Sequence, residues 1–418
     1  MDSLRTVKRA VGAIAGLTML AGPALAGDLT FWTWRQEDRA QYAQLFADFN
    51  RTNPGINIRF EAYEPQNYQT IVSTALAAGR GPDVIHVRAY GGLEQFARAG
   101  YLMPLDNQTV PELANFTAEA LASETLRSDN RVYAVPFASQ TLGVFYNRDI
   151  FQRLNLQPPQ TWEQFIAACR AIKAANLVPV ANGTATAWMT EVLTSVFTGS
   201  FLGPQFAADV VAGRATFEDP RYVAALGKML ELRECLPNGF TGVDYPTSQQ
   251  LFLSGRAAMF AGGSFEISNF RRQNANLPME FIAPPAPAAG QPGLVSLFFD
   301  GGYAINARTG NRDDALKLVR FMATPEFGNR LTALLGNISP IRGVQVQDPM
   351  LARVAQLNQN SWPYIMAVYF RYDSPTGSEL LQGAVQRMMA GNATPQQVGT
   401  EITQGIARYY QPFQRRGG

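Results

Sequence analysis

The sequence predicts an α/β fold with two lobes, each a helix-covered and mostly parallel sheet, joined by strands that cross between the lobes. Two observations predict it. First, strands and helices alternate from residue 28 onward, and the alternation restarts after residue 141. Second, strand-like runs at 133–137 and 142–146 flank a polar segment, 138–141, that contains neither Gly nor Pro. A tight hairpin favours Gly or Asn-Gly at its turn, so we interpret 138–141 as an extended crossing between two sheets.

The first alternation contains three strands and three helices. Apolar runs predict the strands, and amphipathic spacing predicts the helices between them. The expected strands are 29–34, 56–63 and 83–87, and the expected helices are 39–50, 67–78 and 94–99. Strands that alternate with helices in this way favour a largely parallel sheet with helices on its faces.

The second alternation opens with a capping box. Thr161 is the expected N-cap and Gln164 the residue that reaches back, which predicts a helix to about residue 175. Ser264 is the expected N-cap of a later helix. The remaining elements expected up to that point are a strand at 178–182, mainly helical segments over 189–236 and a strand at 257–261.

A second crossing is predicted near the end of this series. The apolar run 297–306 reads as a strand, but Asp300-Gly301-Gly302 interrupts it. We interpret the interruption as another passage between the lobes. Helices at 311–323 and 325–335 follow, and the tail after residue 348 is mostly helical by pattern.

The first 26 residues have the pattern of a secretory signal peptide. Arg5, Lys8 and Arg9 form a basic start, an apolar core covers 11–21, and small residues precede an expected cleavage after Ala26. The apolar core is short for a membrane span, and no later run approaches the required length. No Cys follows the cleavage site, so we expect no lipid anchor there. The sequence therefore predicts a soluble, exported protein, most simply in a periplasm.

Charge and cysteine content limit the possible partners. The chain has a formal net charge of +2, and the signal segment carries three basic residues and one acid, so the remainder is neutral. A neutral protein argues against nucleic acid or an anionic membrane surface as a partner. Cys169 and Cys235 are the only cysteines, each on an expected helix. For an exported chain, a disulfide and two separate buried thiols both remain open.

The residue inventory excludes several kinds of catalytic or cofactor site. His86 is the single histidine, so a multi-His metal site is excluded, and no Walker loop, dinucleotide fingerprint or zinc-type cysteine pattern occurs. We therefore expect no cofactor and no metal. Three carboxylates, Glu37, Glu266 and Asp300, could in principle form a glycosidase pair. The same groups serve equally well as acceptors for sugar hydroxyls.

Aromatic residues at the ends of expected strands and in loops, with Trp362 and Tyr364 in a late loop, are the positive signal. Sugar rings stack their C–H faces on aromatic rings, and their hydroxyls bind Arg, Gln, Asp and Glu. In α/β sheets such a mixture collects at the carboxyl ends of strands. Trp32 and Trp34 alternate along the first strand and so face opposite sides, and we assign Trp34 to the cleft. The other aromatics in such positions are Tyr90, Trp188, Phe265, Trp362 and Tyr364.

Seven segments in order resemble one known family. They are LTFWTW, GRGPDVIHV with LEQFARAGYLMPLD, RVYAVPFASQTLGVFYNRDIF, PPQTWEQF, FLSGRAAMFAGGSFEI, GGYAIN and ATPEF. Together with the signal peptide they resemble the family 1 extracellular solute-binding proteins, the periplasmic sugar receptors of ABC importers. The resemblance runs from about residue 28 to 340 and weakens towards the C-terminus.

The resemblance implies a two-lobed Venus-flytrap fold. The N-lobe would hold 27–138 plus 302–342, the C-lobe 141–299 plus 343–418, with hinge crossings near 138–141 and 299–302. Phe265 stands where relatives more often have Trp. The resemblance and the residue chemistry together give one set of candidate ligand-binding residues: Trp34, Arg35, Glu37, Arg88, Tyr90, Gln140, Trp188, Phe265, Glu266, Asp300, Gly301, Trp362 and Arg371.

The expected function is a monomeric periplasmic receptor that binds a sugar or oligosaccharide between its lobes and delivers it to a membrane permease, without catalysis. Two alternatives remain open. The same fold could carry a polyamine, an osmolyte, a sugar phosphate or a glycerophosphodiester, and an anionic cargo would recruit Arg35, Arg88 and Arg371 together. The other alternative is a secreted glycosidase.

Overall fold

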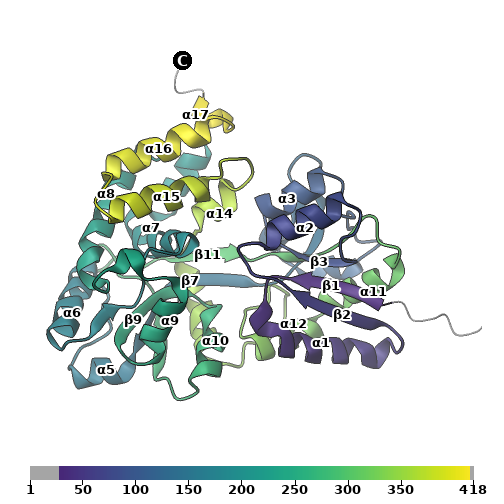
Figure 1. Ribbon diagram of the computed structural model, residues 1–418, viewed down its shortest axis with the longest axis horizontal. Coiled ribbons are helices and arrows are strands. Elements are labelled where there is room, and N and C mark those ends of the chain that lie inside the picture. The colour runs from purple at the N-terminus through teal and green to yellow at the C-terminus, as the bar shows by residue number, and fades with distance from the viewer. Residues whose placement is uncertain (1–27, 415–418) are drawn as a thin grey trace, which may run out of the picture.

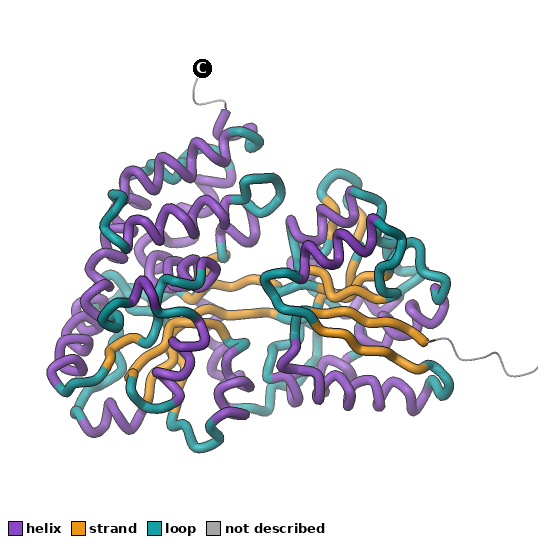
Figure 2. The backbone as a smooth tube through the Cα atoms, in the orientation of Figure 1, coloured by secondary structure: helices purple, strands orange, loops and turns teal. Residues whose placement is uncertain are grey.

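The computed structural model describes residues 28–414, so the predicted signal peptide and its cleavage after Ala26 lie outside the described residues. The described chain forms two lobes side by side, and strands β7 and β11 run through the region where the lobes meet (Figure 1). Strands occupy the middle of each lobe and helices lie around them (Figure 2). Within residues 28–414, no helix combines the length and apolar character needed to cross a membrane.

The first lobe is built on a five-stranded sheet with the order β2-β1-β3-β12-β6. Strands β1, β2 and β3 pair in parallel, and β12 is antiparallel to both β3 and β6. One strand thus runs against the other four. The strands are β1 Asp28–Thr33, β2 Asn57–Ala62, β3 Val84–Val87, β6 Ala134–Pro136 and β12 Gly302–Ile305.

Two separate apolar cores cover the two faces of this sheet. One contains Phe31, Tyr42 and Leu331 and packs α1, α11 and α12 on one face, whereas the other contains Ile85 and Tyr68 and packs α2 and α3 on the opposite face. A short hairpin, β4 Thr125–Leu126 with β5 Arg131–Val132, lies beside α3. The helices of this lobe are η1 Gln36–Asp38, α1 Arg39–Thr52, α2 Tyr68–Ala77, α3 Gly91–Arg98, η2 Pro111–Asn115, α4 Ala118–Ser123, α11 Arg312–Met322 and α12 Pro325–Leu335.

The second lobe has a six-stranded sheet in which β7 is antiparallel to its neighbours β9, β10 and β11, while β8 and β13 pair in parallel at the two edges. One strand again runs against the rest, so the predicted fold class is confirmed. The strands are β7 Ser139–Asn147, β8 Val178–Val180, β9 Ala257–Gly263, β10 Met279–Ile282, β11 Val295–Phe299 and β13 Ser361–Pro363.

The second lobe has one large apolar core, to which its long helices contribute. The predicted capping box of Thr161 and Gln164 is present at the start of α6. The helices are α5 Arg148–Arg153, α6 Trp162–Ala174, α7 Ala187–Val211, α8 Pro220–Leu232, η3 Arg233–Cys235, η4 Phe240–Gly242, α9 Tyr245–Leu253, α10 Glu266–Gln273, α13 Pro349–Leu357, η5 Asn358–Asn360, α14 Ile365–Tyr369, α15 Gly377–Met389, α16 Pro395–Ala407 and α17 Gln411–Gln414.

The chain passes between the sheets where the polar segments occur in the sequence. Strand β6 ends in the first sheet at Pro136, and β7 begins in the second sheet at Ser139. Strand β11 likewise ends in the second sheet at Phe299, and β12 begins in the first at Gly302. The predicted break at 138–141 is shorter in the structure, because residues 139–141 already pair with β11. The division into an N-lobe of 27–138 plus 302–342 and a C-lobe of 141–299 plus 343–418 stays a prediction.

Ser264 does not cap α10, contrary to the prediction. The N-cap position is Phe265, without a side-chain cap bond. The Ser264 hydroxyl instead donates to Gln140 Oε1 at 2.7 Å and accepts the backbone N–H of Thr141 at 3.1 Å. Both partners lie on β7, so the Ser264 side chain bonds to this neighbouring strand and not to the backbone of α10.

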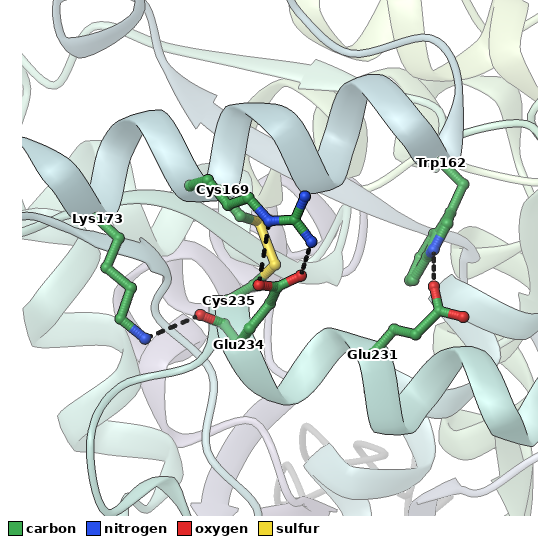
Figure 3. Close-up of a disulfide and its surroundings, with 7 residues drawn as sticks. Trp162, Cys169, Lys173, Glu231, Glu234 and Cys235 are labelled. Carbon is green, nitrogen blue, oxygen red and sulfur yellow. Dashed lines mark hydrogen bonds and ion pairs between the residues drawn. A yellow bond between two sulfur atoms is a disulfide. The ribbon is translucent and has the colours of Figure 1, made fainter.

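A disulfide joins Cys169 on α6 to Cys235 at the end of η3, with 5.3 Å between the Cα atoms (Figure 3). Both cysteines are buried in the second-lobe core. Two polar contacts lie beside the disulfide: Trp162 Nε1 on α6 donates to Glu231 on α8 at 2.6 Å, and Lys173 Nζ on α6 donates to the carbonyl of Glu234 on η3 at 3.3 Å. Of the two states left open by the sequence, the structure has the disulfide.

Candidate functional site

Asp300 lies at the centre of the candidate site, between strands β11 and β12. Its Oδ1 is 3.6 Å from Arg88 Nη1, and its Oδ2 is 4.0 Å from Arg35 Nη1. Its backbone N–H donates to the carbonyl of Ala138 at 3.0 Å, which fixes the carboxyl group against the other crossing. Burial raises the pKa of Asp300 although Arg88, Arg35 and Arg371 favour its charged form. The second crossing thus presents a carboxyl group to arginines from the first lobe.

Arg35 follows β1 and is held by carboxylates on its own turn. It pairs with Asp38 through Nε and with Glu37 at 3.5 Å, and its backbone N–H donates to Thr33 Oγ1 at 3.1 Å. Burial lowers the pKa of Arg35, but Asp38, Glu37 and Asp300 outweigh this effect and the net pKa is raised. The guanidinium is therefore a fixed, fully charged donor. Of its carboxylate partners on this turn, Glu37 is exposed whereas Asp38 is buried.

Trp34 is more buried than the assignment to the cleft implied. Its side chain is 4% exposed and packs in the same core as Tyr68, with the His86 ring 4.0 Å away. The guanidinium of Arg88 lies 3.8 Å from the indole ring. Arg88 thus lies over the indole ring in this arrangement, and the assignment of Trp34 as a direct ligand contact stays a prediction.

Gly301 allows the close packing behind Asp300. Its φ is +126°, and a Cβ placed there would lie 2.2 Å from the Val87 carbonyl oxygen and 2.9 Å from Trp34 Cη2. Only glycine fits this backbone conformation and this space. The role of Gly301 in the structure is thus to bring the crossing strand against β3 and Trp34.

Tyr90 connects the end of β3 to the crossing strand. Its hydroxyl oxygen accepts the backbone N–H of Phe299 at 3.1 Å. Its φ is +57°, a rare conformation for a large side chain that marks a position held by its surroundings. The aromatic ring therefore stands next to Asp300 but is already bonded to the protein.

Gln140 is fully buried and uses both ends of its amide within the protein. Oε1 accepts from Ser264 Oγ at 2.7 Å, and Nε2 donates to Asn337 Oδ1 at 2.8 Å. The backbone N–H of Ser139 also donates to the Ile338 carbonyl at 2.8 Å. Gln140 thus ties the first crossing to the segment between β9 and α10 and to the chain after α12, and its assignment as a ligand contact stays a prediction.

Arg371 reaches the site from the second lobe. Its Nη2 donates to Glu191 Oε1 at 3.1 Å and its Nε donates to Ser378 Oγ at 2.6 Å. Glu191 on α7 is buried and also accepts from Gln382 Nε2 at 2.6 Å. Burial lowers the pKa of Arg371, but Glu191 outweighs it and the net pKa is raised, with a smaller contribution from Asp300. Arginines from both lobes thus act on one carboxyl group.

An aromatic group lines the second lobe near α10. The rings of Trp188 and Tyr245 are 4.6 Å apart, edge to face, and Phe265 lies 6.5 Å from Trp188. Tyr245 also donates to Glu266 Oε1 at 2.7 Å, and Gln249 donates to Oε2 at 2.9 Å. Glu266 is fully buried, and this burial raises its pKa to about 7 despite both hydrogen bonds.

The charge of Glu37 on the first lobe acts on Glu266 and on Tyr245, so the aromatic group lies within electrostatic range of the turn that carries Arg35. A direct ion pair also links the lobes, with 3.8 Å between Arg272 Nη2 on α10 and Asp38 Oδ1. The arrangement offers aromatic faces on one side and fixed donors and acceptors on the other.

Trp362 is packed inside the second lobe. It lies on β13 and not in the expected loop, is 2% exposed, and donates its indole N–H to Ser296 Oγ at 2.6 Å. A Cβ on Gly199 would meet the indole at 2.1 Å, which shows how tightly α7 covers it. Trp362 packs as a core residue of the second lobe, and its assignment as a ligand contact stays a prediction.

Three residues of the site were absent from the sequence predictions: Glu191, Tyr245 and Gln249. Glu191 had a usable signal, because it is an isolated carboxylate within a long apolar helix, and a buried charge needs a partner. Tyr245 and Gln249 lie on α9 without any such local signal. Within residues 28–414, no group of three or more His, Cys, Asp or Glu side chains is placed to hold a metal ion.

Two α/β lobes meet at crossing strands, with charged groups after the strands of one lobe and aromatic rings on the other, an architecture typical of ligand-binding proteins. Residues 33–328 match the family model described as bacterial extracellular solute-binding protein, and the chain belongs to this family.

Curated relatives and solved structures agree with this membership. The multiple sugar-binding protein of Streptococcus mutans is 23% identical over 76% of this chain and 76% of its own length. The maltotriose-binding protein of Pyrococcus abyssi is 25% identical over 78% of this chain and 68% of its own. The solved structure of the bacterial solute receptor AcbH, reported to prefer β-D-galactopyranose, has a TM-score of 0.80 at 18% identity, covering 92% of this chain and 99% of AcbH. The similarity to AcbH shows the fold alone.

Proposed function

We propose that this protein is the sugar-binding receptor of an ABC importer, and that the sugar binds between the lobes beside Asp300. The observation that carries the proposal is the presence of two chemically different groups of side chains, one aromatic and one hydrogen-bonding. The Trp188–Tyr245–Phe265 rings on the second lobe supply apolar faces, and Glu37, Arg88 and Asp300 supply hydrogen-bonding groups. A pyranose presents this combination of C–H faces and hydroxyls.

The names of the relatives support a sugar as the ligand. The two curated relatives are named for binding multiple sugars and maltotriose, and AcbH is reported to prefer β-D-galactopyranose. These ligands differ in length, so they support the class of ligand but favour no particular sugar.

The charge balance favours a neutral ligand over an ionic one. Each arginine that an anionic ligand would need already has a carboxylate partner: Arg35 has Asp38, Arg88 has Asp300, and Arg371 has Glu191. An anion would have to compete with these carboxylates, and a cation such as a polyamine would have to compete with the arginines. Neutral hydroxyl groups can bond to both without breaking the pairs.

The glycosidase alternative is less favoured. Such an enzyme needs one carboxylic acid and one carboxylate that both face the glycosidic bond. Both oxygens of Glu266 accept hydrogen bonds from Tyr245 and Gln249, and both oxygens of Asp300 face arginines. These carboxyl groups are committed to holding neighbouring side chains.

We also propose that the protein is exported, is cleaved after Ala26, works as a monomer in the periplasm, and passes its ligand to a membrane permease. The signal-peptide pattern of residues 1–26 and the membership in an extracellular family support this part. Ligand contacts from both lobes would favour the closed arrangement, and that arrangement is the one a permease would recognise.

A thermal-shift screen of the purified protein tests the proposal. Neutral monosaccharides and oligosaccharides, phosphorylated polyols and polyamines are added in separate wells. A ligand present at about 100 times its Kd stabilises the native state by roughly 2.7 kcal/mol and raises the melting temperature. We expect neutral sugars to raise it. A rise with polyamines or phosphorylated polyols alone would refute the sugar proposal, and new reducing ends in an overnight incubation with the sugars would favour the glycosidase.

The role of the aromatic group of Trp188, Tyr245 and Phe265 is tested with the sugar that the screen identifies. Trp188→Ala should weaken binding about tenfold, because an aromatic contact contributes roughly 1 kcal/mol or more beyond area burial. Trp32→Ala is the matched control, since Trp32 is also partly buried but packs against Tyr63 on the first lobe. If calorimetry gives Trp188→Ala and wild type the same affinity, the aromatic group does not contact the sugar.

A further inference from the structure

The lobes also touch at a place outside the crossing strands. Residues 370–376, between α14 and α15, lie against α3 and the β4–β5 hairpin of the first lobe. In Figure 1 this loop projects from the second lobe towards α3. We call residues 370–376 the strap.

The backbone of the strap packs directly on the first turn of α3. A Cβ placed on Gly91 would lie 1.9 Å from the carbonyl oxygen of Arg371 and 2.8 Å from the backbone nitrogen of Tyr372. Backbone atoms cannot rotate out of the way as a flexible side chain can. Glycine at position 91 is therefore required for this close approach.

Two arginines of the first lobe hold the strap from the other side. The guanidinium carbon of Arg127 is 3.3 Å from the centre of the Tyr372 ring, and Arg98 Nη1 is 3.8 Å from Asp373 Oδ1. Both arginines are anchored on Glu94, which is 2% exposed: Arg127 Nε donates to Oε2 at 2.9 Å, and Arg98 donates to Oε1. The first lobe thus presents a preorganised cationic surface that receives an aromatic ring and a carboxylate.

The strap is also connected to the candidate binding site. Arg371 belongs to the strap, and its side chain pairs with Glu191 while its charge acts on Asp300. The strap therefore carries a charge that acts on the carboxyl group at the centre of the site.

We propose that the strap is a latch: its contact with Gly91, Arg98 and Arg127 holds the two lobes in the arrangement described here and is released when they separate. The proposal does not depend on which ligand binds. A partly exposed cation–π contact and an exposed ion pair are each weak, so the latch shifts the equilibrium between lobe arrangements without locking it.

The test uses the full mature chain without ligand, so its outcome is independent of the sugar proposal. Spin labels are placed at two exposed helical positions, Ser73→Cys on α2 and Gln396→Cys on α16, and the distance between them is measured by pulsed electron paramagnetic resonance. In the labelled background, Tyr372→Ala removes the ring and Gly91→Ala inserts a methyl group under the strap. We expect both to increase the ratio of longer to shorter distances by about threefold to tenfold.

Two control variants separate the latch from general damage. Tyr372→Phe keeps the ring and should retain the parent distance distribution. Arg131→Ala should also retain the parent distribution, because Arg131 is an exposed arginine of the same hairpin that makes no ring contact or ion pair with the strap among the described residues. Arg127→Ala removes the cation that contacts Tyr372 and should behave like Tyr372→Ala. The proposal is overturned if Tyr372→Ala and Gly91→Ala both give the parent distance distribution while their melting temperatures show that they fold.

Discussion

The buried carboxyl group of Glu266 gives a prediction with a defined sign. Burial raises its pKa to about 7 from the ordinary value of 4.5. Between these two values the folded protein keeps a proton that the unfolded chain releases, so the contribution of Glu266 lowers the free energy of unfolding as the pH rises. The full effect corresponds to about 3 kcal/mol, present above pH 7 and absent below pH 4.5.

The variant Glu266→Gln removes this titration and keeps an oxygen that accepts from Tyr245, while its amide nitrogen donates to Gln249 once the Gln249 amide turns over. Relative to wild type, we expect it to be up to about 3 kcal/mol more stable at pH 8 and nearly equal at pH 4.5. Urea unfolding at pH 4.5, 6, 7 and 8 measures the difference. His86 and all other titrating groups are common to both proteins, so their contributions cancel in the difference between the two curves.

Glu163→Gln is the control, because it removes a carboxyl group from an exposed position at the start of α6 in the same lobe. Its difference from wild type should stay nearly constant across this pH range. A Glu266→Gln curve parallel to that of wild type would refute the argument, since it would mean that Glu266 is as accessible to water in the native state as in the unfolded chain.

Three further predictions concern the crossings and the disulfide. The double variant Cys169→Ser with Cys235→Ser should lose about 2–4 kcal/mol in urea unfolding, and a reductant should lower the stability of wild type but not of the variant. Asp300→Asn should cost only about 1 kcal/mol, because it removes the carboxylate partner of the partly exposed Arg88 while burial already disfavours the charge of Asp300; a loss of about 3 kcal/mol or more would show that the pair is shielded from solvent. Gly301→Ala should lower the melting temperature measurably, because its Cβ would lie 2.2 Å from a backbone oxygen; an unchanged value would mean that the crossing can shift.

The sequence was sufficient for features encoded by short, local patterns. The alternation of strands and helices predicted both sheets, and the capping box at Thr161 predicted the start of α6, because these signals depend on neighbouring residues. The interruption at Asp300 and Gly301 separates β11 from β12 as expected. The family resemblance of the motifs agrees with the family match over residues 33–328.

The individual site residues were harder to predict because their roles depend on contacts between distant segments. Gln140 looked free to bind a ligand, yet Ser264 and Asn337, both far away in the sequence, use both ends of its amide. Trp34 is covered by Arg88 and Trp362 by α7, and no local pattern distinguishes a covered indole from an open one. Polar side chains near a hinge are needed to hold the hinge as well as to bind a ligand.

The place of β12 in the first sheet has a consequence for the order of folding. It lies between β3 and β6 and joins them, yet it is synthesised after the strands β7 to β11 of the second lobe. A nascent chain that ends before residue 302 has no strand to join β6 to the rest of its sheet. The first lobe therefore completes its sheet only after most of the second lobe has emerged, and the long sequence separation of these contacts favours slow folding with the two lobes coupled.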